Sequence, residues 1–277
     1  MSSKTLYRFR PLGSFGEKAH DREVFQHRLD ECKEGLSERI FVSPLLEQND
    51  IFEFAPYISS SNDDALLALR DKICATSKED EVIRSLKQAP LAEIRGFIRE
   101  GLEIMKETTK IACLSEAEKN PLMWGHYAGS HSGICMQYSL SEFLPDETRV
   151  VALPMMYQQK RPGLKEINAL RFITFGRWRE AAMPEDENLA MTAFRKISRF
   201  KSADWKYERE WRIAKPFASS DEKYALVPGL KLEAIIFGTK TLGSDREAFI
   251  QNAPKSLKFK EAVAHESKFE MQIRNIN

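Results

Sequence analysis

The sequence predicts a mixed α+β protein whose sheets are mostly antiparallel. Short stretches alternate apolar and polar residues, which is the period of strands, and longer stretches repeat apolar residues every three or four positions, as helices do. No stretch rich in glycine, proline and serine divides the chain, and no internal repeat is present. We therefore expect a single domain over residues 1–277, with a helical insertion at about 62–109.

Alternation marks the expected strands. Each expected strand is short, and Pro154 interrupts one of them because proline cannot donate to a sheet ladder. In chain order, the expected strands are residues 5–10, 39–43, 110–115, 133–138, 149–157, 207–215, 224–227, 232–237, 259–263 and 269–273.

Apolar spacing and end signals mark the expected helices. The signals are Gly35 as a stop, Asn62 as an N-cap, Pro90 in a first turn, and the pairs Ser77/Asp80 and Ser244/Glu247 as capping boxes. The expected helices are residues 17–34, 63–75, 79–87, 90–105, 121–128, 164–178, 187–200 and 244–250. Residues 48–56 are expected to form a loop.

Composition bounds the class of protein. With 42% hydrophobic and 30% charged residues, the chain has enough apolar side chains for a core and is not a disordered polymer. Its net charge of +1 argues against a protein that coats nucleic acid. Residues 158–212, however, hold 13 Lys or Arg against 8 Asp or Glu. This basic stretch suits an anionic ligand, and a solvated helical face explains it equally well.

Cysteine usage and hydropathy predict the compartment. The four cysteines form no CxxC pair and are expected to be reduced thiols. No apolar run has the length of a signal peptide at the start of the sequence, and none approaches the roughly 20 residues that span a membrane. We expect a cytoplasmic protein with no membrane contact.

The strongest local motif is the stretch from Tyr207 to Ile213. In a strand, Glu208, Glu210 and Arg212 would share one face, where one carboxylate can orient the other. Pattern alone favours the alternative, a solvent-facing strand with ordinary ion pairs.

A second motif gathers two of the five histidines in the chain with two aromatic residues. His126 and Tyr127 could contact a ligand through imidazole and phenol groups, with Trp124 beside them and His131 following. An equally weighted alternative makes Trp124 and Tyr127 core residues and the histidines surface residues. A metal site is less favoured, because its carboxylates would have to come from elsewhere in the chain.

Two further stretches carry polar groups. Asn49 and Asp50 precede Glu53 in a segment typical of a capping turn. On the first strand, Arg8 and Arg10 follow Tyr7 at a spacing that places both guanidinium groups on one face, where they could hold phosphate or carboxylate. A plain turn and an edge strand with solvated arginines are the favoured alternatives. The motifs of P-loop, Rossmann, zincin and α/β-hydrolase enzymes are missing from the sequence.

Taken together, these motifs resemble the mostly bacterial family catalogued as domain of unknown function 2971. The resemblance spans residues 6–238, with Ile51 where the family usually has proline. The matching residues are Tyr7, Arg8, Phe9, Arg10; Asn49, Asp50, Phe52, Glu53; Cys113, Leu114, Ser115, Glu116; Met123, Trp124, His126, Tyr127, Ala128, His131, Gly133; Tyr207, Glu208, Glu210, Trp211, Arg212; and Ile236, Phe237, Gly238.

The order of the motifs is similar to that of functional residues in ADP-ribosyltransferases, an analogy of layout alone. It implies a split pair of small sheets with NAD, used as a substrate, in the cleft between them. By this analogy Glu210 would stabilise the ribose as nicotinamide leaves, and Glu208 would orient it or the acceptor. Arg8 or Arg10 would pair with the pyrophosphate or ribose, Tyr127 would stack on nicotinamide and His126 would hydrogen-bond the ribose. The remaining candidates for NAD contacts are Tyr7, Asn49, Asp50, Trp124, His131 and Arg212.

Three functions are therefore expected in order of preference. The first is an ADP-ribosyltransferase-like enzyme, a toxin or phage-defence effector acting on a protein or nucleic-acid acceptor. The second is a metal-dependent nuclease or phosphodiesterase built from Asp50, Glu53, His126 and His131 with the two late glutamates. The third is a module that senses a ligand such as NAD or another anionic nucleotide without turnover.

Overall fold

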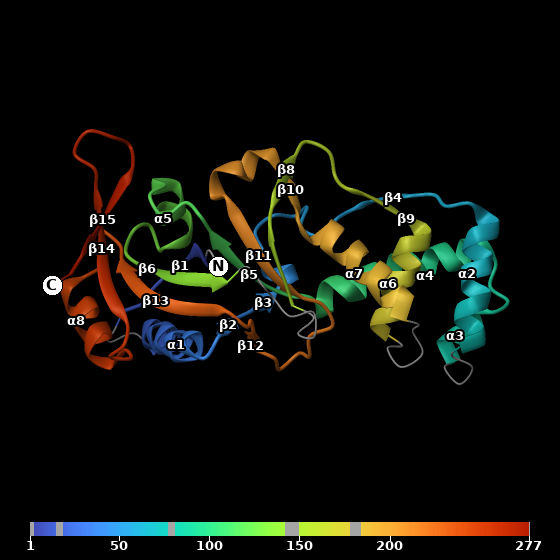
Figure 1. Cartoon of the computed structure of the whole chain (residues 1–277), viewed down its shortest axis with the longest axis horizontal. Helices are drawn as coiled ribbons and strands as arrows, with labels where there is room; N and C mark the ends of the chain where they lie inside the picture. The colour runs from blue at the N-terminus through green and yellow to red at the C-terminus, as the bar shows by residue number, and fades with distance from the viewer. Residues whose placement is uncertain (1–2, 15–18, 77–80, 142–149, 178–183, 277) are drawn as a thin grey trace.

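A computed structural model describes residues 3–14, 19–76, 81–141, 150–177 and 184–276. A nine-stranded, largely antiparallel sheet forms its centre, and a lobe of helices packs at one end of that sheet (Figure 1). The mixed α+β class predicted from the sequence is confirmed.

The large sheet follows the order β15-β14-β13-β6-β1-β5-β11-β7, and β3 pairs with β5. Only β13 and β14 are parallel neighbours among the described strands of this sheet. The inner strand β5 is buried along almost its whole length because side chains cover both faces of the sheet. Its strands are β1 (Ser3–Arg10), β3 (Ser43–Pro44), β5 (Lys110–Ser115), β6 (Ile134–Ser141), β7 (Val151–Pro154), β11 (Glu210–Lys215), β13 (Leu230–Phe237), β14 (Lys258–Ala264) and β15 (Met271–Asn275).

The junction of β1 with β5 is the narrowest in the large sheet. β1 pairs with β6 from Ser3 to Arg10, but it shares register with β5 only where Tyr7 faces Ser115. The sheet therefore consists of one part that ends at β1 and another that begins at β5, and the two parts diverge beyond this single pair. The cavity described below lies at the divergence.

Three pairs of short strands lie outside the large sheet. They are β2 (Arg39–Phe41) with β12 (Tyr224–Leu226), β4 (Tyr57–Ser59) with β9 (Gly163–Lys165), and β8 (Met156–Gln158) with β10 (Phe200–Ser202). The sequence did not predict β4, β9 or β10, because three residues are too few to display an alternating period.

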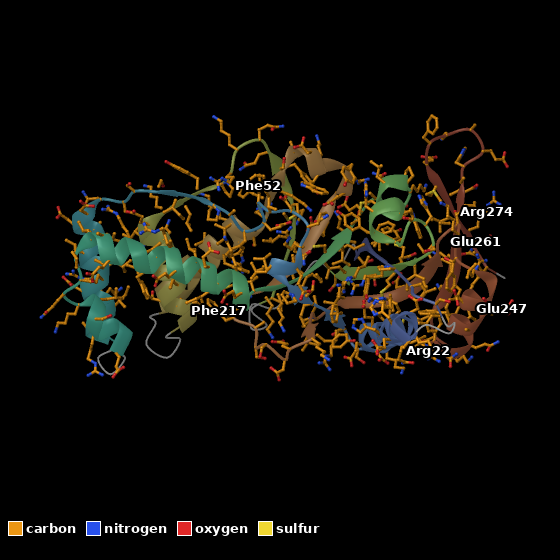
Figure 2. The ribbon with its side chains drawn as sticks, turned by 180° about the vertical axis from the view of Figure 1, so that it is seen from behind. Arg22, Phe52, Phe217, Glu247, Glu261 and Arg274 are labelled. Atoms are coloured by element: carbon orange, nitrogen blue, oxygen red, sulfur yellow. The ribbon has the colours of Figure 1, made fainter. Side chains whose placement is uncertain are left out.

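Helices cover both faces of the sheet and form the lobe. They are α1 (Ala19–Leu36), α2 (Asp63–Thr76), α3 (Glu81–Leu86), α4 (Leu91–Thr108), α5 (Pro121–Tyr127), α6 (Glu166–Arg177), α7 (Pro184–Ser198) and α8 (Gly243–Asn252), with 3₁₀ segments η1 (Leu45–Glu47) and η3 (Ala203–Glu208). The lobe joins α2, α3 and α4, which lie in the expected stretch 62–109, to the later helices α6 and α7 around one hydrophobic cluster. Figure 2 shows Phe217 where the lobe meets the sheet; its ring lies 5.8 Å from that of Phe172.

Several helix ends differ from the expectation. Asn62 caps α2 as predicted, because its Oδ1 accepts a hydrogen bond from the Ala65 amide. Pro90, by contrast, is the N-cap of α4 rather than a residue of its first turn. The capping box of Ser244 and Glu247 is wrong: α8 begins one residue earlier, with Leu242 as an N-cap that makes no side-chain bond. The pair Ser77/Asp80 lies outside the described residues.

Among the described residues, no helix combines the length and apolar character needed to cross a membrane.

Candidate functional site

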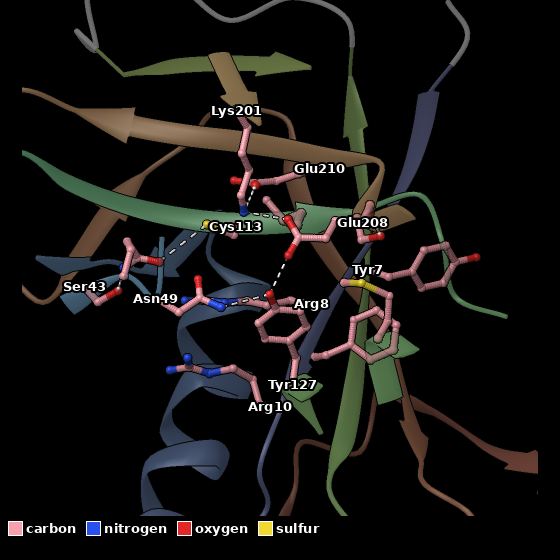
Figure 3. A pocket seen from close by; sticks show the side chains of 15 residues that line it. Tyr7, Arg8, Arg10, Ser43, Asn49, Cys113, Tyr127, Lys201, Glu208 and Glu210 are labelled. Atoms are coloured by element: carbon pink, nitrogen blue, oxygen red, sulfur yellow. Dashed lines mark hydrogen bonds and ion pairs between the residues drawn. The ribbon is translucent and has the colours of Figure 1, made fainter. Parts of the chain in front are cut away.

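A cavity of about 140 Å³ lies where β1 and β5 separate (Figure 3). It has room for roughly four or five water molecules at about 30 Å³ each. Seven of the predicted site residues line it: Tyr7, Arg8, Arg10, Asn49, Tyr127, Glu208 and Glu210. Its other lining residues are Phe9, Ser43, Gln48, Cys113, Leu114, Ser115, Met123 and Lys201.

Arg8 and Arg10 line one side of the cavity, and together with Arg28 and Glu31, which contact them from outside its lining, they form a group that we call the arginine wall. Alternation along β1 turns Arg8 and Arg10 toward α1, whose Arg28 and Glu31 lie one helical turn apart. Glu31 accepts from Arg10 at 3.0 Å, contacts Arg28, and lies 3.8 Å from Arg8. Three guanidinium groups against one carboxylate leave an excess of two positive charges.

This excess is buried and incompletely hydrogen-bonded. Arg8 is 4% exposed, and neither its Nη1 nor the Nε of Arg10 has a hydrogen-bond partner in the described part of the chain. Burial, with Arg10 next in importance, lowers the pKa of Arg8 to about 9, and burial likewise lowers the pKa of Arg28 to about 9. Both groups therefore stay charged at neutral pH, at a cost that a bound anion would offset.

Lys201, Glu208 and Glu210 line another side of the cavity, and together with Glu53 and Arg212, which contact them from outside its lining, they form a group that we call the carboxylate wall. Lys201 Nζ lies 2.6 Å from Glu208 Oε2, 3.0 Å from Glu210 Oε2 and 3.7 Å from Glu53 Oε1. Arg212 donates to Glu210 at 3.0 Å and to Glu53 at 2.7 Å. All five side chains are buried, which overturns the alternative of a solvent-facing strand. With every carboxylate ionised, this wall carries one excess negative charge.

The two late glutamates have opposite pKa shifts. Burial raises the pKa of Glu208, and the nearby Glu210 charge adds to the rise against the opposing charge of Lys201. Burial would also raise the pKa of Glu210, but Arg212 and Lys201 outweigh it and hold that pKa at about 2. One carboxylate is thus fixed as an anion while its neighbour can exchange a proton nearer neutrality, a division of roles typical of acid–base sites.

Tyr127 connects α5 to the carboxylate wall. Its hydroxyl donates to Glu208 Oε1 and accepts from Asn49 Nδ2 at 3.2 Å. Figure 3 shows this chain of bonds running across the cavity, with the Tyr7 ring turned away from it. Burial and the bond to Glu208 raise the pKa of the Tyr127 phenol, so it acts as a donor and not as an anion.

The backbone that places Glu208 at the cavity is not the strand predicted over 207–215. Residues 203–208 form η3, Arg209 adopts a left-handed conformation with φ 46°, and β11 begins only at Glu210. The turn at Arg209 swings Glu208 back beside Glu210, so the two carboxylates meet without strand alternation. A non-glycine residue at positive φ costs local strain and often marks a functional site.

Five predicted site residues do not line the cavity. Trp124 is fully buried, donates to the Glu118 carbonyl and packs edge-on against Phe9, as a core residue does. Asp50 closes a turn by accepting from the Phe52 amide at 2.9 Å. Arg212 lies behind Glu210 and acts through it.

The two histidines of the second motif also lie outside the cavity. His126 is exposed, with its ring 6.2 Å from that of Tyr127. His131 sits at φ 75° in a turn, where its carbonyl accepts from the Lys240 amide at 2.9 Å. A Cβ on Gly238 would come within 2.2 Å of that carbonyl, so His131 and Gly238 shape the backbone there.

Sequence reasoning missed Lys201, Arg28 and Glu31 as site residues. For Arg28 and Glu31 a signal exists, because they lie beside Phe25 and Leu29 on the apolar face of α1, where a charge is costly. Lys201 lies in the three-residue strand β10, and no sequence pattern marks it.

The predicted metal alternative has no ligand cluster to support it. In the described ranges, no three His, Cys, Asp or Glu side chains are arranged to hold a metal ion. Lys201 Nζ occupies the point on which the carboxylates of Glu53, Glu208 and Glu210 converge.

Fold and cavity define an α+β protein with a buried, charged pocket where two parts of one sheet diverge. Residues 123–213 match the model of a family described as "Protein of unknown function (DUF2971)", which confirms over that stretch the family that the motifs predict. The match includes Tyr127 and the carboxylate wall except for Glu53, while the arginine wall lies outside it. No curated protein and no solved structure matches the chain.

Proposed function

We propose that the protein is an ADP-ribosyltransferase-like enzyme that uses NAD as its substrate. The observation that carries this proposal is the opposite charge of the two walls: two excess positive charges on the arginine wall face one excess negative charge on the carboxylate wall. NAD has the matching pattern, with two negative charges on its pyrophosphate and one positive charge on nicotinamide. Such complementarity steers and orients a charged ligand.

The pose follows from these charges. The pyrophosphate would lie against Arg8 and Arg10, the two guanidinium groups that line the cavity. The nicotinamide ribose would lie near Tyr127 and Glu208. Ligand sites usually enclose about 300–1,000 Å³. This cavity is smaller, so it would enclose the reacting end of NAD and leave the adenosine outside.

In the proposed reaction, the bond from ribose C1′ to nicotinamide nitrogen breaks and its electron pair leaves with nicotinamide. Positive charge builds on the ribose, and the fixed anion of Glu210 stabilises it electrostatically. The acceptor then forms a bond to C1′ and gives up its proton. The raised pKa of Glu208 suits it to take that proton as a general base.

The test incubates the protein with labelled NAD and cell extract and measures free nicotinamide and labelled macromolecules. We expect Glu208→Gln to lower the transfer of label to macromolecules roughly 100-fold or more, the usual contribution of a general base. Glu261→Gln is the matched control, since Glu261 forms only a surface ion pair with Arg246. Expression of the wild type, but not of Glu208→Gln, should arrest bacterial growth if the enzyme is a toxin or defence effector. Absence of nicotinamide release from the wild type would contradict the proposal.

A second candidate is a sensor that binds the same ligand without turnover. One observation favours it: Arg212 and Lys201 together engage both carboxylate oxygens of Glu210, which leaves less of its charge for a transition state. Calorimetry would then detect NAD binding that Arg8→Gln abolishes, while nicotinamide release stays at the level of the buffer.

A further inference from the structure

Four aromatic side chains form a row that leads to the cavity. We call Tyr127, His126, Tyr207 and Trp205 the ring row. Ring centroids along it are 6.2 Å apart between Tyr127 and His126, 6.3 Å between His126 and Tyr207, and 6.2 Å between Tyr207 and Trp205. The planes of successive rings are tilted by 67°, 47° and 39°, so their faces point in different directions, and the residues come from two separate elements, α5 and η3.

The side chain of Asn120 also links these two elements, in addition to the bond from Tyr127 to Glu208. Asn120 caps α5 by accepting from the Leu122 amide at 2.9 Å, and its Nδ2 donates to the Tyr207 carbonyl at 3.2 Å. In Figure 1 α5 lies beside the segment that precedes β11, in agreement with this bond. The ring row is therefore a fixed surface and not a chance meeting of mobile side chains.

The ring row is open to solvent and bordered by positive charge. His126 is exposed, and the other three rings are half-buried. Lys206 and Arg209, on and beside η3, are exposed cations, and Arg209 also forms an ion pair with Glu116 at 2.8 Å. Asp204, the acidic residue at the start of η3, accepts from the Ser202 hydroxyl at 2.9 Å.

We propose that the ring row stacks the unpaired bases of single-stranded nucleic acid and that Lys206 and Arg209 contact its phosphates. Every base offers a flat π-face, and rows of aromatic side chains with neighbouring cations are the common means of binding single strands without sequence preference. The bases of a duplex already stack on one another, so they are not free to stack on the rings.

The ring row ends at the cavity, which links single-strand binding to the proposed reaction. Its last ring belongs to Tyr127, whose hydroxyl donates to Glu208 inside the cavity. A base stacked on Tyr127 would lie beside the cavity, which is where the proposed reaction requires the acceptor to be. The role as acceptor rests on the proposed function, whereas the binding itself does not require NAD.

The experiment measures fluorescence anisotropy of a labelled single-stranded DNA, a single-stranded RNA and a DNA duplex, each about 12 nucleotides long, within the site sizes usual for such surfaces. We expect tighter binding of the single strands. Tyr207→Leu should weaken single-strand binding roughly 5- to 150-fold, the equivalent of one lost base stack, whereas Tyr207→Phe should retain it. Tyr57→Leu is the matched control, because Tyr57 is an exposed tyrosine on β4, outside the ring row.

A second readout addresses the cations. Lys206→Gln should lower the slope of log K against log salt by about 0.7, the value for one phosphate contact on a single strand. Equal affinity for duplex and single strand, or no effect of Tyr207→Leu, would overturn the proposal.

The outcome is separable from that of the NAD assay. Binding of single strands by a wild type that releases no nicotinamide would retain this proposal and reject the enzyme. Nicotinamide release with labelling of protein alone, and no oligonucleotide binding, would reject the ring-row proposal and retain the enzyme.

Discussion

The two walls of the cavity use the same kinds of side chain to opposite effect. On the carboxylate wall, three carboxylates share two cations, and each cation contacts at least two carboxylates. On the arginine wall, three guanidinium groups share one carboxylate, and three buried guanidinium nitrogens and one oxygen of Glu31 make no hydrogen bond within the described residues.

Under the proposed function, this difference separates charges that stabilise the fold from charges that would contact the ligand. Removing one partner of a satisfied buried network leaves an uncompensated charge, which is strongly destabilising. Removing one member of an unbalanced cluster relieves repulsion, so its cost in stability is small. Substitution of a cation on each wall therefore distinguishes the two roles.

The largest effect is expected for Arg212→Met. This change leaves Glu53 and Glu210 buried without their shared guanidinium group, and we expect the free energy of unfolding to fall by about 3–5 kcal/mol. Urea denaturation measures it. Arg246→Met removes a half-exposed ion pair with Glu261 as the control and should cost no more than about 1 kcal/mol. A comparable loss in both variants would show that the wall is not a cooperative network.

Lys201→Met should cost somewhat less, about 2–3 kcal/mol. Its ammonium contacts three carboxylates, but the pKa values of Glu208 and Glu53 are already raised by burial, and these groups can take up protons when the cation is gone. The loss should therefore shrink as the pH is lowered, because protonation removes the unpaired charge. Unfolding measured at two pH values checks this.

On the arginine wall, Arg10→Gln should change stability by no more than about 1 kcal/mol, since it removes a surplus charge together with one bond to Glu31. Its effect should appear instead in binding. Inorganic pyrophosphate should raise the melting temperature of the wild type, and this rise should be largely lost in Arg10→Gln. If Arg10→Gln destabilised the protein as much as Lys201→Met does, the charges of the two walls would not differ in their contribution to stability.

Tyr127→Phe tests the contact between α5 and the carboxylate wall. Loss of the hydroxyl leaves Glu208 Oε1 and Asn49 Nδ2 without this partner, at an expected cost of about 1–3 kcal/mol. Thermal unfolding measures it, together with a Tyr57→Phe control at an exposed tyrosine on β4.

The smallest effect concerns His27, which lies 3.5 Å from Glu31. Burial, followed by the charges of Arg28 and Arg10, lowers its pKa to about 4. The unfolded chain, with a pKa near 6.5, binds the proton more readily, so stability should fall as pH drops from about 6.5 to 4. His27→Gln should flatten this slope, whereas His20→Gln, at an exposed position, should not.

The same histidine reports on the ligand. An anion on the arginine wall offsets the neighbouring guanidinium charges, so pyrophosphate should raise the pKa of the His27 ring in an NMR titration. An unchanged or lower pKa would mean that the anion binds elsewhere.

Elements with a full period were predictable from the sequence, and contacts between them were not. Strand alternation and helical spacing located β1, β5, α1 and α4 to within a few residues. The last two strands, β14 and β15, were also predicted from the sequence. The short strand β10, which carries Lys201, has no period to detect.

The site was predictable in part, because its residue types are unusual for their positions. Two arginines at alternate positions of an apolar strand, and two glutamates around Arg209, pointed to one location. The proposed spacing argument for Glu208 and Glu210 was nevertheless incorrect, since a left-handed residue joins them. The pairing of Arg8 and Arg10 with Glu31 depends on how α1 packs against β1, which only the fold supplies.

The single register pair between Tyr7 and Ser115 makes β1 an edge strand inside the protein. Beyond that pair, the side of β1 that faces β5 is outside their ladder and borders the cavity. An edge on the outside of a sheet invites pairing with other chains and has to be blocked by charge or distortion. Here the side chains that line the cavity surround this part of β1, so it is not exposed for pairing with another chain.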